Sequence, residues 1–385
     1  MNRKYIIKEF DFFRNLRFIN KTTFPHSLKI PKSITFALNI KNMKTIIIWF
    51  YCILVCSLFQ AKAQNSNTAF RIVKKIHLEG DAGWDYLYSD DQSGKLYVSH
   101  GNMVQVVDMK TDTLLGTITG LNGVHGIAIA SDLNKGFISN GRDSSVTIFN
   151  TKTLQVIARI KVTGQNPDAI LFDPFSRKVF TFNGRSSNST VIDAETNLVT
   201  ATIALEGKPE FSVTDGKGKI YVNIEDKSKI CKINTSTLKV EQSWSIAPGE
   251  EPSGLALDNE THRLFSVCDN KTMVVVNAET GKIISTLPIG DRVDGAAFDP
   301  GLKYAYSSNG DGTLTIVKEE NKDSFSIVTN LPTQKGARTI AINKITHHIY
   351  LPTAEFEQVP KSEAGNQKRR PKILPNSFIV LDIAP

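Results

Sequence analysis

A unit of about 42 residues recurs seven times along the chain, and this repeat limits the possible folds more than any other feature. The segment FISNGRDSSVTIFN (137–150) returns as AYSSNGDGTLTIVK (305–318), four units later. Each unit holds short apolar strands, and one residue stands just before the first strand of each: Asp85, His125, Asp168, Glu210, Ser253, Asp294 and Arg338. The steps between these residues are 40, 43, 42, 43, 41 and 44. Four strands at this period are typical of a β-propeller blade.

The sequence therefore predicts an all-β fold, a seven-bladed β-propeller with four antiparallel strands per blade. A lone four-stranded sheet would leave two apolar faces exposed, and stacking on neighbouring blades buries them. Asn-Gly pairs between second and third strands, as at Asn140, predict tight hairpin turns because both residue types accept a positive φ. The seventh unit lacks its own fourth strand, whereas residues 69–78 form a strand without a partner. We expect this N-terminal strand to join blade seven and close the ring.

Two segments resemble a known family. VIDAETNLVTATI (191–203) and VVNAETGKIISTL (275–287), together with strands such as KIYVN (219–223), resemble the YVTN repeats of YncE-like β-propeller proteins. The resemblance covers residues 69–385. It implies the propeller fold and brings single-stranded nucleic-acid binding into consideration. It does not select a function, since propellers host enzymes, electron carriers and binding modules.

Residues 43–63 have the pattern of a cleaved signal peptide: a lysine, the apolar run 46–59, and the small-x-small motif Ala-Lys-Ala at 61–63. A membrane-spanning helix needs about 20 apolar residues, so a retained anchor is the weaker alternative. Residues 1–42 have two explanations. Either the start codon was assigned too early and Met43 is the true initiator, or these residues are a genuine N-terminal extension. We expect a periplasmic or secreted protein in which residues 64–385 form one propeller, with no membrane span once the signal is removed.

The formal charge of +8 belongs mostly to the N-terminal segment. Residues 1–63 carry 11 Lys/Arg and 2 Asp/Glu. Subtracting these from the totals of 46 and 38 leaves 35 basic and 36 acidic residues, a net charge of −1. A nucleic-acid partner is therefore disfavoured, though not excluded, because counterion release needs many cationic contacts. Outside residues 1–63 the cysteines are Cys231 and Cys268, which we expect to be buried free thiols.

An Asp/Asn-x-x-Thr pattern follows the third strand of several units, and an Asp-Pro pair follows the first strand of two. Short polar side chains at such places bond the local backbone of a turn. We therefore assign a structural role to the following residues: Asp108, Asn150, Asp193, Asn234, Asn277, Asp173 and Asp299.

The residues that precede the first strands should ring one mouth of the central channel, because the first strand of a propeller blade lines that channel. Carboxylates crowded there would raise one another's pKa values unless a cation or Arg338 offsets the repulsion. Oxygen ligands suit Ca²⁺ or Mg²⁺, and a histidine widens the choice to Zn²⁺ or Mn²⁺. The candidate metal ligands are Asp85, His125, Asp168, Glu210 and Asp294. A solvated rim without a ligand is the alternative.

Further candidates are expected on the same face. Arg142 and Arg185 occupy corresponding positions in adjacent units and carry a guanidinium suited to carboxylate or phosphate. His100 follows the second strand of the first unit, and Trp84 is placed either to stack a sugar or base or to fill the space between blades. The insertion 355–375 in the last unit, with basic residues at 368–372, is a flap, a partner-docking loop or a segment without a role.

Three functions remain open from the sequence. The first is a monomeric, non-catalytic binding module for a small anionic or saccharide ligand, or for a protein, at the channel mouth. The second is a metal-dependent, lactonase-like hydrolase, in which the ion polarises a carbonyl and activates water. The third is single-stranded nucleic-acid binding. The sequence has no C-x-x-C-H, no Gly-rich phosphate loop and no G-x-S-x-G, but a site assembled from distant blades needs no local motif.

Overall fold

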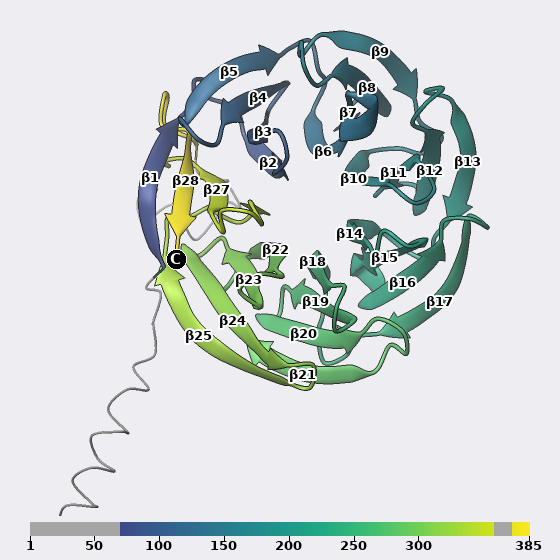
Figure 1. Ribbon diagram of the computed structural model, residues 1–385, viewed down its shortest axis with the longest axis vertical. Helices are drawn as coiled ribbons and strands as arrows, with labels where there is room; N and C mark the ends of the chain where they lie inside the picture. Colours follow the sequence, from purple (N-terminus) through teal and green to yellow (C-terminus); the bar gives the residue numbers. More distant parts are fainter. Residues whose placement is uncertain (1–69, 358–371) are drawn as a thin grey trace, which may run out of the picture. The chain divides into compact units, whose positions relative to one another are not determined.

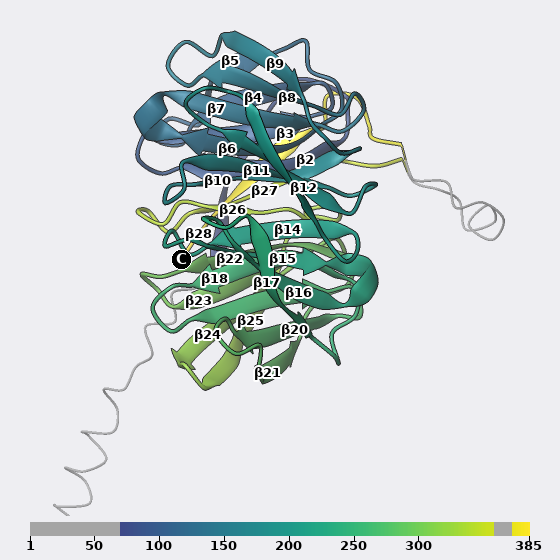
Figure 2. The same ribbon diagram turned by 90° about the vertical axis from the view of Figure 1, so that its right-hand side faces the viewer.

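Seven four-stranded antiparallel sheets follow one another around a central channel (Figure 1). This computed structural model describes residues 70–357 and 372–385. The predicted fold, an all-β seven-bladed propeller, is confirmed. Seen from the side, the strands run from one face of the ring to the other (Figure 2). The turns therefore lie on two opposite faces, and the first strand of each blade is innermost (Figure 1).

The first three blades follow the predicted units. Blade 1 holds β2 (Trp84–Asp90), β3 (Lys95–His100), β4 (Met103–Asp108) and β5 (Thr113–Ile118). Blade 2 holds β6 (Val124–Ala130), β7 (Lys135–Asn140), β8 (Ser145–Asn150) and β9 (Val156–Lys161). Blade 3 holds β10 (Pro167–Asp173), β11 (Lys178–Asn183), β12 (Asn188–Asp193) and β13 (Val199–Ala204).

The next three blades repeat the same order. Blade 4 holds β14 (Pro209–Thr214), β15 (Lys219–Ile224), β16 (Lys229–Asn234) and β17 (Lys239–Ser245). Blade 5 holds β18 (Pro252–Asp258), β19 (Arg263–Cys268), β20 (Thr272–Asn277) and β21 (Ile283–Pro288). Blade 6 holds β22 (Val293–Asp299), β23 (Tyr304–Asn309), β24 (Thr313–Asn321) and β25 (Ser324–Pro332). The helical elements of the described residues are the single 3₁₀ turns η1 (Ser131–Leu133) and η2 (Glu225–Lys227).

Blade 7 closes the ring with strands from both ends of the described chain. Its order is β26 (Ala341–Ile342), β27 (Ile349–Thr353), β28 (Ile379–Ala384) and β1 (Arg71–His77). β1 pairs with β28 from Arg71↔Ala384 to His77↔Ile379. The prediction that the N-terminal strand supplies the outer strand of blade 7 is confirmed. Closure joins the two ends of the sheet series, so that no blade has an uncovered face.

The core lies between adjacent blades, where apolar side chains of facing sheets meet. Phe265 of blade 5 stacks on Phe298 of blade 6 with ring centroids 5.2 Å apart. Burying such a side chain stabilises the fold by about 1.5–3 kcal/mol. Nearer the channel the inner strands approach closely: a Cβ on Gly254 would lie 2.5 Å from the backbone nitrogen of Ala296. Glycine is needed there because any side chain would displace the neighbouring strand.

The prediction that Asn-Gly pairs form tight turns between second and third strands is wrong. Asn140 is the last residue of β7 and pairs with Ser145, so four residues form the turn, and the positive φ of 51° falls on Ser144. The buried Asn140 amide donates to the Thr147 hydroxyl at 3.0 Å. Gly141 is required for another reason, since a Cβ there would lie 2.5 Å from Nε2 of His125.

The structural role assigned to the Asp/Asn-x-x-Thr pattern is confirmed. The Asp108 carboxylate accepts hydrogen bonds from the backbone nitrogens of Lys110 (2.8 Å) and Thr111 (3.0 Å). The same arrangement occurs at Asn150, Asp193, Asn234 and Asn277. In the Asp-Pro turns, the carboxylates of Asp173 and Asp299 accept from the backbone nitrogens of Ser176 and Gly301.

The predicted thiols are also confirmed. Cys231 and Cys268 are buried and free. Burial raises the pKa of each thiol to about 12. Both cysteines therefore remain protonated at neutral pH and act as small apolar core residues.

Several predictions concern residues outside the described ranges. The extension 1–42, the signal peptide 43–63 and most of the insertion, including its basic residues 368–372, lie there. The base of the insertion is described and joins β27 to β28, with a bridge between Phe356 and Ile373. Within residues 70–357 and 372–385, no helix has the length and apolar character needed to cross a membrane.

Candidate functional site

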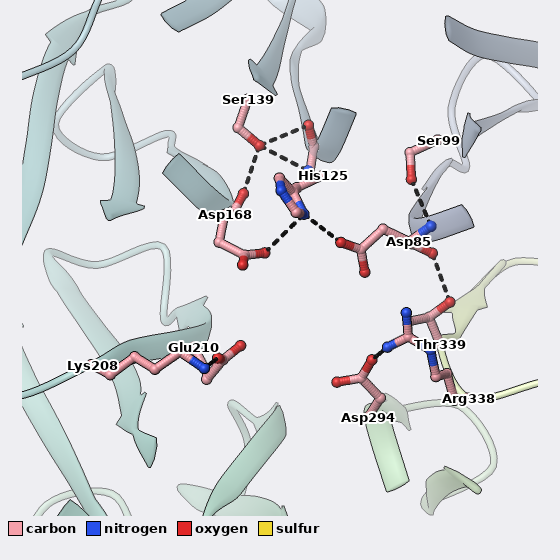
Figure 3. Close-up of polar contacts among 11 residues, drawn as sticks. Asp85, Ser99, His125, Ser139, Asp168, Lys208, Glu210, Asp294, Arg338 and Thr339 are labelled. Carbon is pink, nitrogen blue, oxygen red and sulfur yellow. Dashed lines mark hydrogen bonds and ion pairs between the residues drawn. The ribbon is translucent and has the colours of Figure 1, made fainter. Parts of the chain in front are cut away.

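Six charged or ionisable side chains meet around one mouth of the channel (Figure 3). They come from the start of β2, β6, β10, β14 and β22, and from the residue that leads into the inner strand of blade 7. We call them the ring: Asp85, His125, Asp168, Glu210, Asp294 and Arg338. All six were predicted from the repeat. Ser253 occupies the equivalent place in blade 5, where its hydroxyl donates to the backbone oxygen of Val293 (3.2 Å).

Hydroxyl groups fix the backbone of the ring residues. Ser139 of β7 accepts from the nitrogen of Gly126 (2.8 Å) and donates to the oxygen of Asp168 (2.6 Å), linking blades 2 and 3 (Figure 3). Thr339 donates to the backbone oxygen of Asp85 (2.7 Å), whose nitrogen donates to Ser99 (3.1 Å). Each bond lies in or beside the core. The scaffold therefore holds the ring rigidly, a requirement for specific binding.

His125 stands between two carboxylates. Its Nδ1 lies 2.6 Å from Oδ2 of Asp85 and 3.5 Å from Oδ1 of Asp168. Burial opposes the imidazolium, but the hydrogen bond to Asp85 and the charges of Asp168, Asp85 and Glu210 outweigh it and raise the His125 pKa to about 9. Burial raises the Asp168 pKa to about 6, although the His125 charge opposes this shift. At neutral pH the group is a cation held by two carboxylates.

Glu210 is held by a cation that the repeat did not reveal. Lys208 lies 2.5 Å from Oε1 of Glu210 and also pairs with Glu225. Burial, with the charge of Asp168, raises the Glu210 pKa to about 8 in spite of Lys208. Lys208 precedes the ring residue by two positions in an extended chain, so both side chains point the same way. That spacing is the sequence signal that identifies it.

Arg338 pairs with Asp294 on the other side of the mouth (Figure 3). The Asp294 side chain is 22% exposed and that of Arg338 is 40% exposed, so both still face solvent. Every ring carboxylate thus has a cationic neighbour. His125, Lys208 and Arg338 are interleaved with the acids and offset part of the expected repulsion between carboxylates. Burial and the remaining repulsion still raise the pKa values of Asp168 and Glu210.

The five predicted metal ligands do not gather at one point. Nδ1 of His125 and one carboxylate oxygen each of Asp85 and Asp168 lie within 4.8 Å of one another, a spacing that one ion could bridge. Glu210 and Asp294 instead pair with Lys208 and Arg338. With nitrogen present, the group of three suits Zn²⁺ or Mn²⁺ better than Ca²⁺.

Two aromatic rings lie beneath the mouth and were missed at the sequence level. Tyr86 of blade 1 and Phe211 of blade 4 contact each other across the channel, with ring centroids 5.4 Å apart. The Tyr86 pKa is raised well above its usual value by burial and by the charges of Asp168, Glu210 and Asp85, so its hydroxyl stays protonated at neutral pH. Among the described residues no side chain or backbone group hydrogen-bonds that hydroxyl at the distances expected for such a bond.

The sequence does carry a signal for these two rings. Both aromatic residues directly follow a ring residue. The other blades carry small residues at that position: Gly126, Ala169, Gly254, Gly295 and Thr339. Two large aromatic side chains in a column of small residues indicate that they fill space which the other blades leave free.

The remaining candidates are not members of the ring. His100 is fully buried, with Nε2 2.9 Å from the oxygen of Ala82, and its ring stacks on Phe378 at a centroid distance of 4.0 Å. It therefore has no surface for a ligand. Trp84 packs against Phe378 and against Phe356 at the base of the insertion. This agrees with the expectation that it fills space between blades instead of stacking on a ligand. Arg142 and Arg185 are exposed in turns on the same face.

Comparison with known proteins supports the fold alone. No protein-family model and no curated protein sequence matches the chain. Among solved structures, the chain is similar to Kuenenia stuttgartiensis hydrazine synthase, with 17% identity, a TM-score of 0.63, and coverage of 71% of this chain and 94% of that one. It is also similar to U3-55K, with 9% identity, a TM-score of 0.67, and coverage of 81% and 98%. Fold and site together define a seven-bladed β-propeller with a polar ring at one channel mouth.

Proposed function

We propose that this protein is a non-catalytic binding module whose ring holds a small saccharide or a similar polyhydroxylated molecule. The observation that carries the proposal is the ring of interleaved donors and acceptors above an aromatic floor with a free phenol. A sugar hydroxyl both donates and accepts. It can donate to Asp85, Asp168 or Asp294 and accept from Arg338 or Lys208.

The floor supports the same ligand class. The apolar face of a sugar ring packs well on aromatic side chains, and Tyr86 and Phe211 offer such a surface beneath the ring. Tyr86 is 9% exposed as a residue, and its hydroxyl would gain a hydrogen-bond partner from the ligand. An anionic ligand is disfavoured, because acidic groups outnumber cations at this mouth and repulsion would weaken its binding.

Calorimetric titration with a panel of neutral mono- and oligosaccharides tests the proposal. We expect saturable one-to-one binding to at least one of them. Asp168→Asn should weaken it by about tenfold or more, as expected for a hydrogen bond to a charged group worth ~1.5–3 kcal/mol. Asp269→Asn, at an exposed residue outside the ring, is the matched control and should bind as the parent does. Absence of any saccharide binding, or an Asp168→Asn variant that binds normally, would refute the proposal.

A metal-dependent hydrolase is the second candidate function, favoured by the close approach of Asp85, His125 and Asp168. An ion held by these residues would act as a Lewis acid toward a substrate carbonyl. Mass spectrometry of the purified protein checks this directly. A stoichiometric divalent ion that is lost in His125→Ala would support the hydrolase, whereas a metal-free protein that gains no melting temperature from added Zn²⁺ or Mn²⁺ would refute it.

The periplasmic or secreted location is part of the same proposal, because extracellular saccharides would then be accessible to the ring. It rests on the signal pattern in residues 43–63. N-terminal sequencing of the mature protein should begin at Gln64. A mature protein that retains residues 43–63 would contradict a cleaved signal.

A further inference from the structure

The channel has a second compartment on the far side of Tyr86 and Phe211. A cavity of about 540 Å³ is lined by the inner strands of all seven blades, and none of the six ring residues lines it. It ends at Tyr86 and Phe211 and extends to the turns after the first strands, where Asp91, Asn259 and Lys344 line it. The two aromatic rings thus separate this compartment, which we call the chamber, from the ring.

Apolar and aromatic side chains form about half of the chamber wall, and polar groups form the rest. Partly exposed side chains line it from several blades: Tyr88, Ile170, Leu171, Phe172, Leu257 and Ile340. In the core of a blade such side chains would be fully buried, so here they keep apolar surface free toward the cavity. Between them stand small residues such as Ala128 and Ala256, which leave the space open.

Polar groups lie at the chamber mouth. Asp91, Asn259 and Lys344 line the end farthest from the aromatic partition. Ser89 is already committed, since its hydroxyl donates to Asp91 at 2.6 Å. Burial raises the pKa of Tyr88 to about 12, so this residue presents a neutral hydroxyl. Ser212, next to Phe211, and Thr214 also line the chamber. An occupant therefore meets apolar side chains and polar groups along the chamber, with the charged residues Asp91 and Lys344 at the opening.

We propose that the chamber is a binding site for a neutral, amphipathic small molecule with an apolar body and several polar groups. Its volume lies within the ~300–1,000 Å³ typical of small-molecule sites. From Tyr86 to Asp91 the inner strand advances about 17 Å at ~3.3 Å per residue, which limits the length of the occupant. The contact of the Tyr86 and Phe211 rings across the channel, at a centroid distance of 5.4 Å, disfavours a polymer threaded through it.

The chamber and the ring favour different ligands. The partly exposed side chains of Leu171, Phe172 and Leu257 line the chamber, and an occupant with an apolar body gains about 25 cal/mol for each Å² of such surface removed from water. A saccharide gains less from these side chains. The proposal is therefore independent of the function proposed for the ring, and one can fail without the other.

N-phenyl-1-naphthylamine, a neutral probe whose fluorescence rises in apolar surroundings, tests the chamber in the purified protein. We expect saturable one-to-one binding. Leu171→Lys in blade 3 and Leu257→Lys in blade 5 should each weaken it by about tenfold or more, since the variants place a charge beside the apolar body of the probe. Leu115→Lys, at a residue 48% exposed on the outer strand β5, is the matched control.

Asp168→Asn separates the two sites, because it should leave probe binding at the parental level while weakening saccharide binding. Where a lysine variant does not fold, as judged by circular dichroism, Leu257→Gln is measured by the same criterion. Absence of saturable probe binding would overturn the proposal. So would chamber variants that bind the probe as tightly as Leu115→Lys does.

Discussion

The two compartments of the channel are built from the same seven inner strands and yet differ in chemistry. At the start of these strands, ionisable residues in six of seven blades form the ring. Three or four positions further along, the residues that line the channel carry no charge and include large apolar side chains, as at Leu171 and Leu257. The comparison teaches that a propeller can present two unrelated surfaces with one repeated element, because the position along the strand decides which end of the channel a residue serves.

The partition between the compartments is where the repeat is broken. Five blades carry Gly, Ala or Thr directly after the ring residue, whereas blades 1 and 4 carry Tyr86 and Phe211. The repeated residues form the scaffold, and the residues that differ between blades form the partition. Three substitutions or conditions test this contrast, taken from the largest expected effect to the smallest.

Tyr86→Ala should remove the partition and join the two compartments. It deletes a buried aromatic side chain, so we expect the free energy of unfolding to fall by about 3 kcal/mol. Urea unfolding measures the change. Tyr86→Phe is the control and should stay within about 1 kcal/mol of the parent, since it keeps the aromatic contact. A loss below about 1 kcal/mol in Tyr86→Ala would show that the two rings do not support each other.

Stability should fall as the pH rises from about 5 to 9, because the folded ring binds protons more tightly than the unfolded chain. Folding raises the pKa of Glu210 from 4.5 to about 8, so its contribution to the free energy of unfolding is complete below pH 4.5 and is lost as the pH rises to about 8. The pKa of His125 rises from 6.5 to about 9, so its contribution is complete below pH 6.5 and is lost through pH 9. The two shifts act in the same direction.

Denaturant unfolding at several pH values measures this slope. We expect a decrease of about 2 kcal/mol between pH 5 and 9, of which roughly half should be absent in Glu210→Gln, because His125 contributes the rest. Glu225→Gln, which alters the other carboxylate bound to Lys208, is the control and should keep most of the slope. If the free energy of unfolding of the parent protein did not change between pH 5 and 9, folding would not raise the pKa values of Glu210 and His125.

Ser139→Ala should have the smallest effect of the three. It removes the hydroxyl that joins Gly126 to Asp168 and leaves a buried carbonyl without its partner, at a cost of about 1–2 kcal/mol. Saccharide binding should weaken with it, because the Asp168 backbone is less firmly placed. Ser236→Ala, at an exposed turn, should change stability by less than ~0.5 kcal/mol. Equal effects of both substitutions would contradict a positioning role for Ser139.

The fold could be predicted from the sequence because each blade is a local unit whose period is visible along the chain. The ring followed from the same period, since equivalent positions of a closed repeat meet at one mouth. The cation on Glu210 did not follow, because Lys208 lies outside the repeated pattern. The Tyr86–Phe211 contact joins blades 1 and 4 across the channel, and no pattern along the chain gives the width that they span.

The Asn-Gly pairs are structurally important, as the sequence indicated, but not for the predicted reason. Asn-Gly was interpreted as turn chemistry, yet the buried Asn140 amide bonds the third strand and Gly141 makes room for His125. Local backbone preference predicted a positive φ at this pair. The glycine is instead explained by His125 on the preceding strand of the same blade, because its side chain occupies the space that a Cβ on Gly141 would need.

The central claim is that the ring binds a polyhydroxylated ligand over the Tyr86 hydroxyl. The most direct measurement is the saccharide affinity of Tyr86→Phe beside that of Tyr88→Phe, which removes the matching hydroxyl from the chamber. Our account predicts a loss of about fivefold to tenfold in Tyr86→Phe, as for one neutral hydrogen bond of ~1 kcal/mol or more, and parental affinity in Tyr88→Phe. Unchanged affinity in Tyr86→Phe, or an equal loss in both variants, would contradict it.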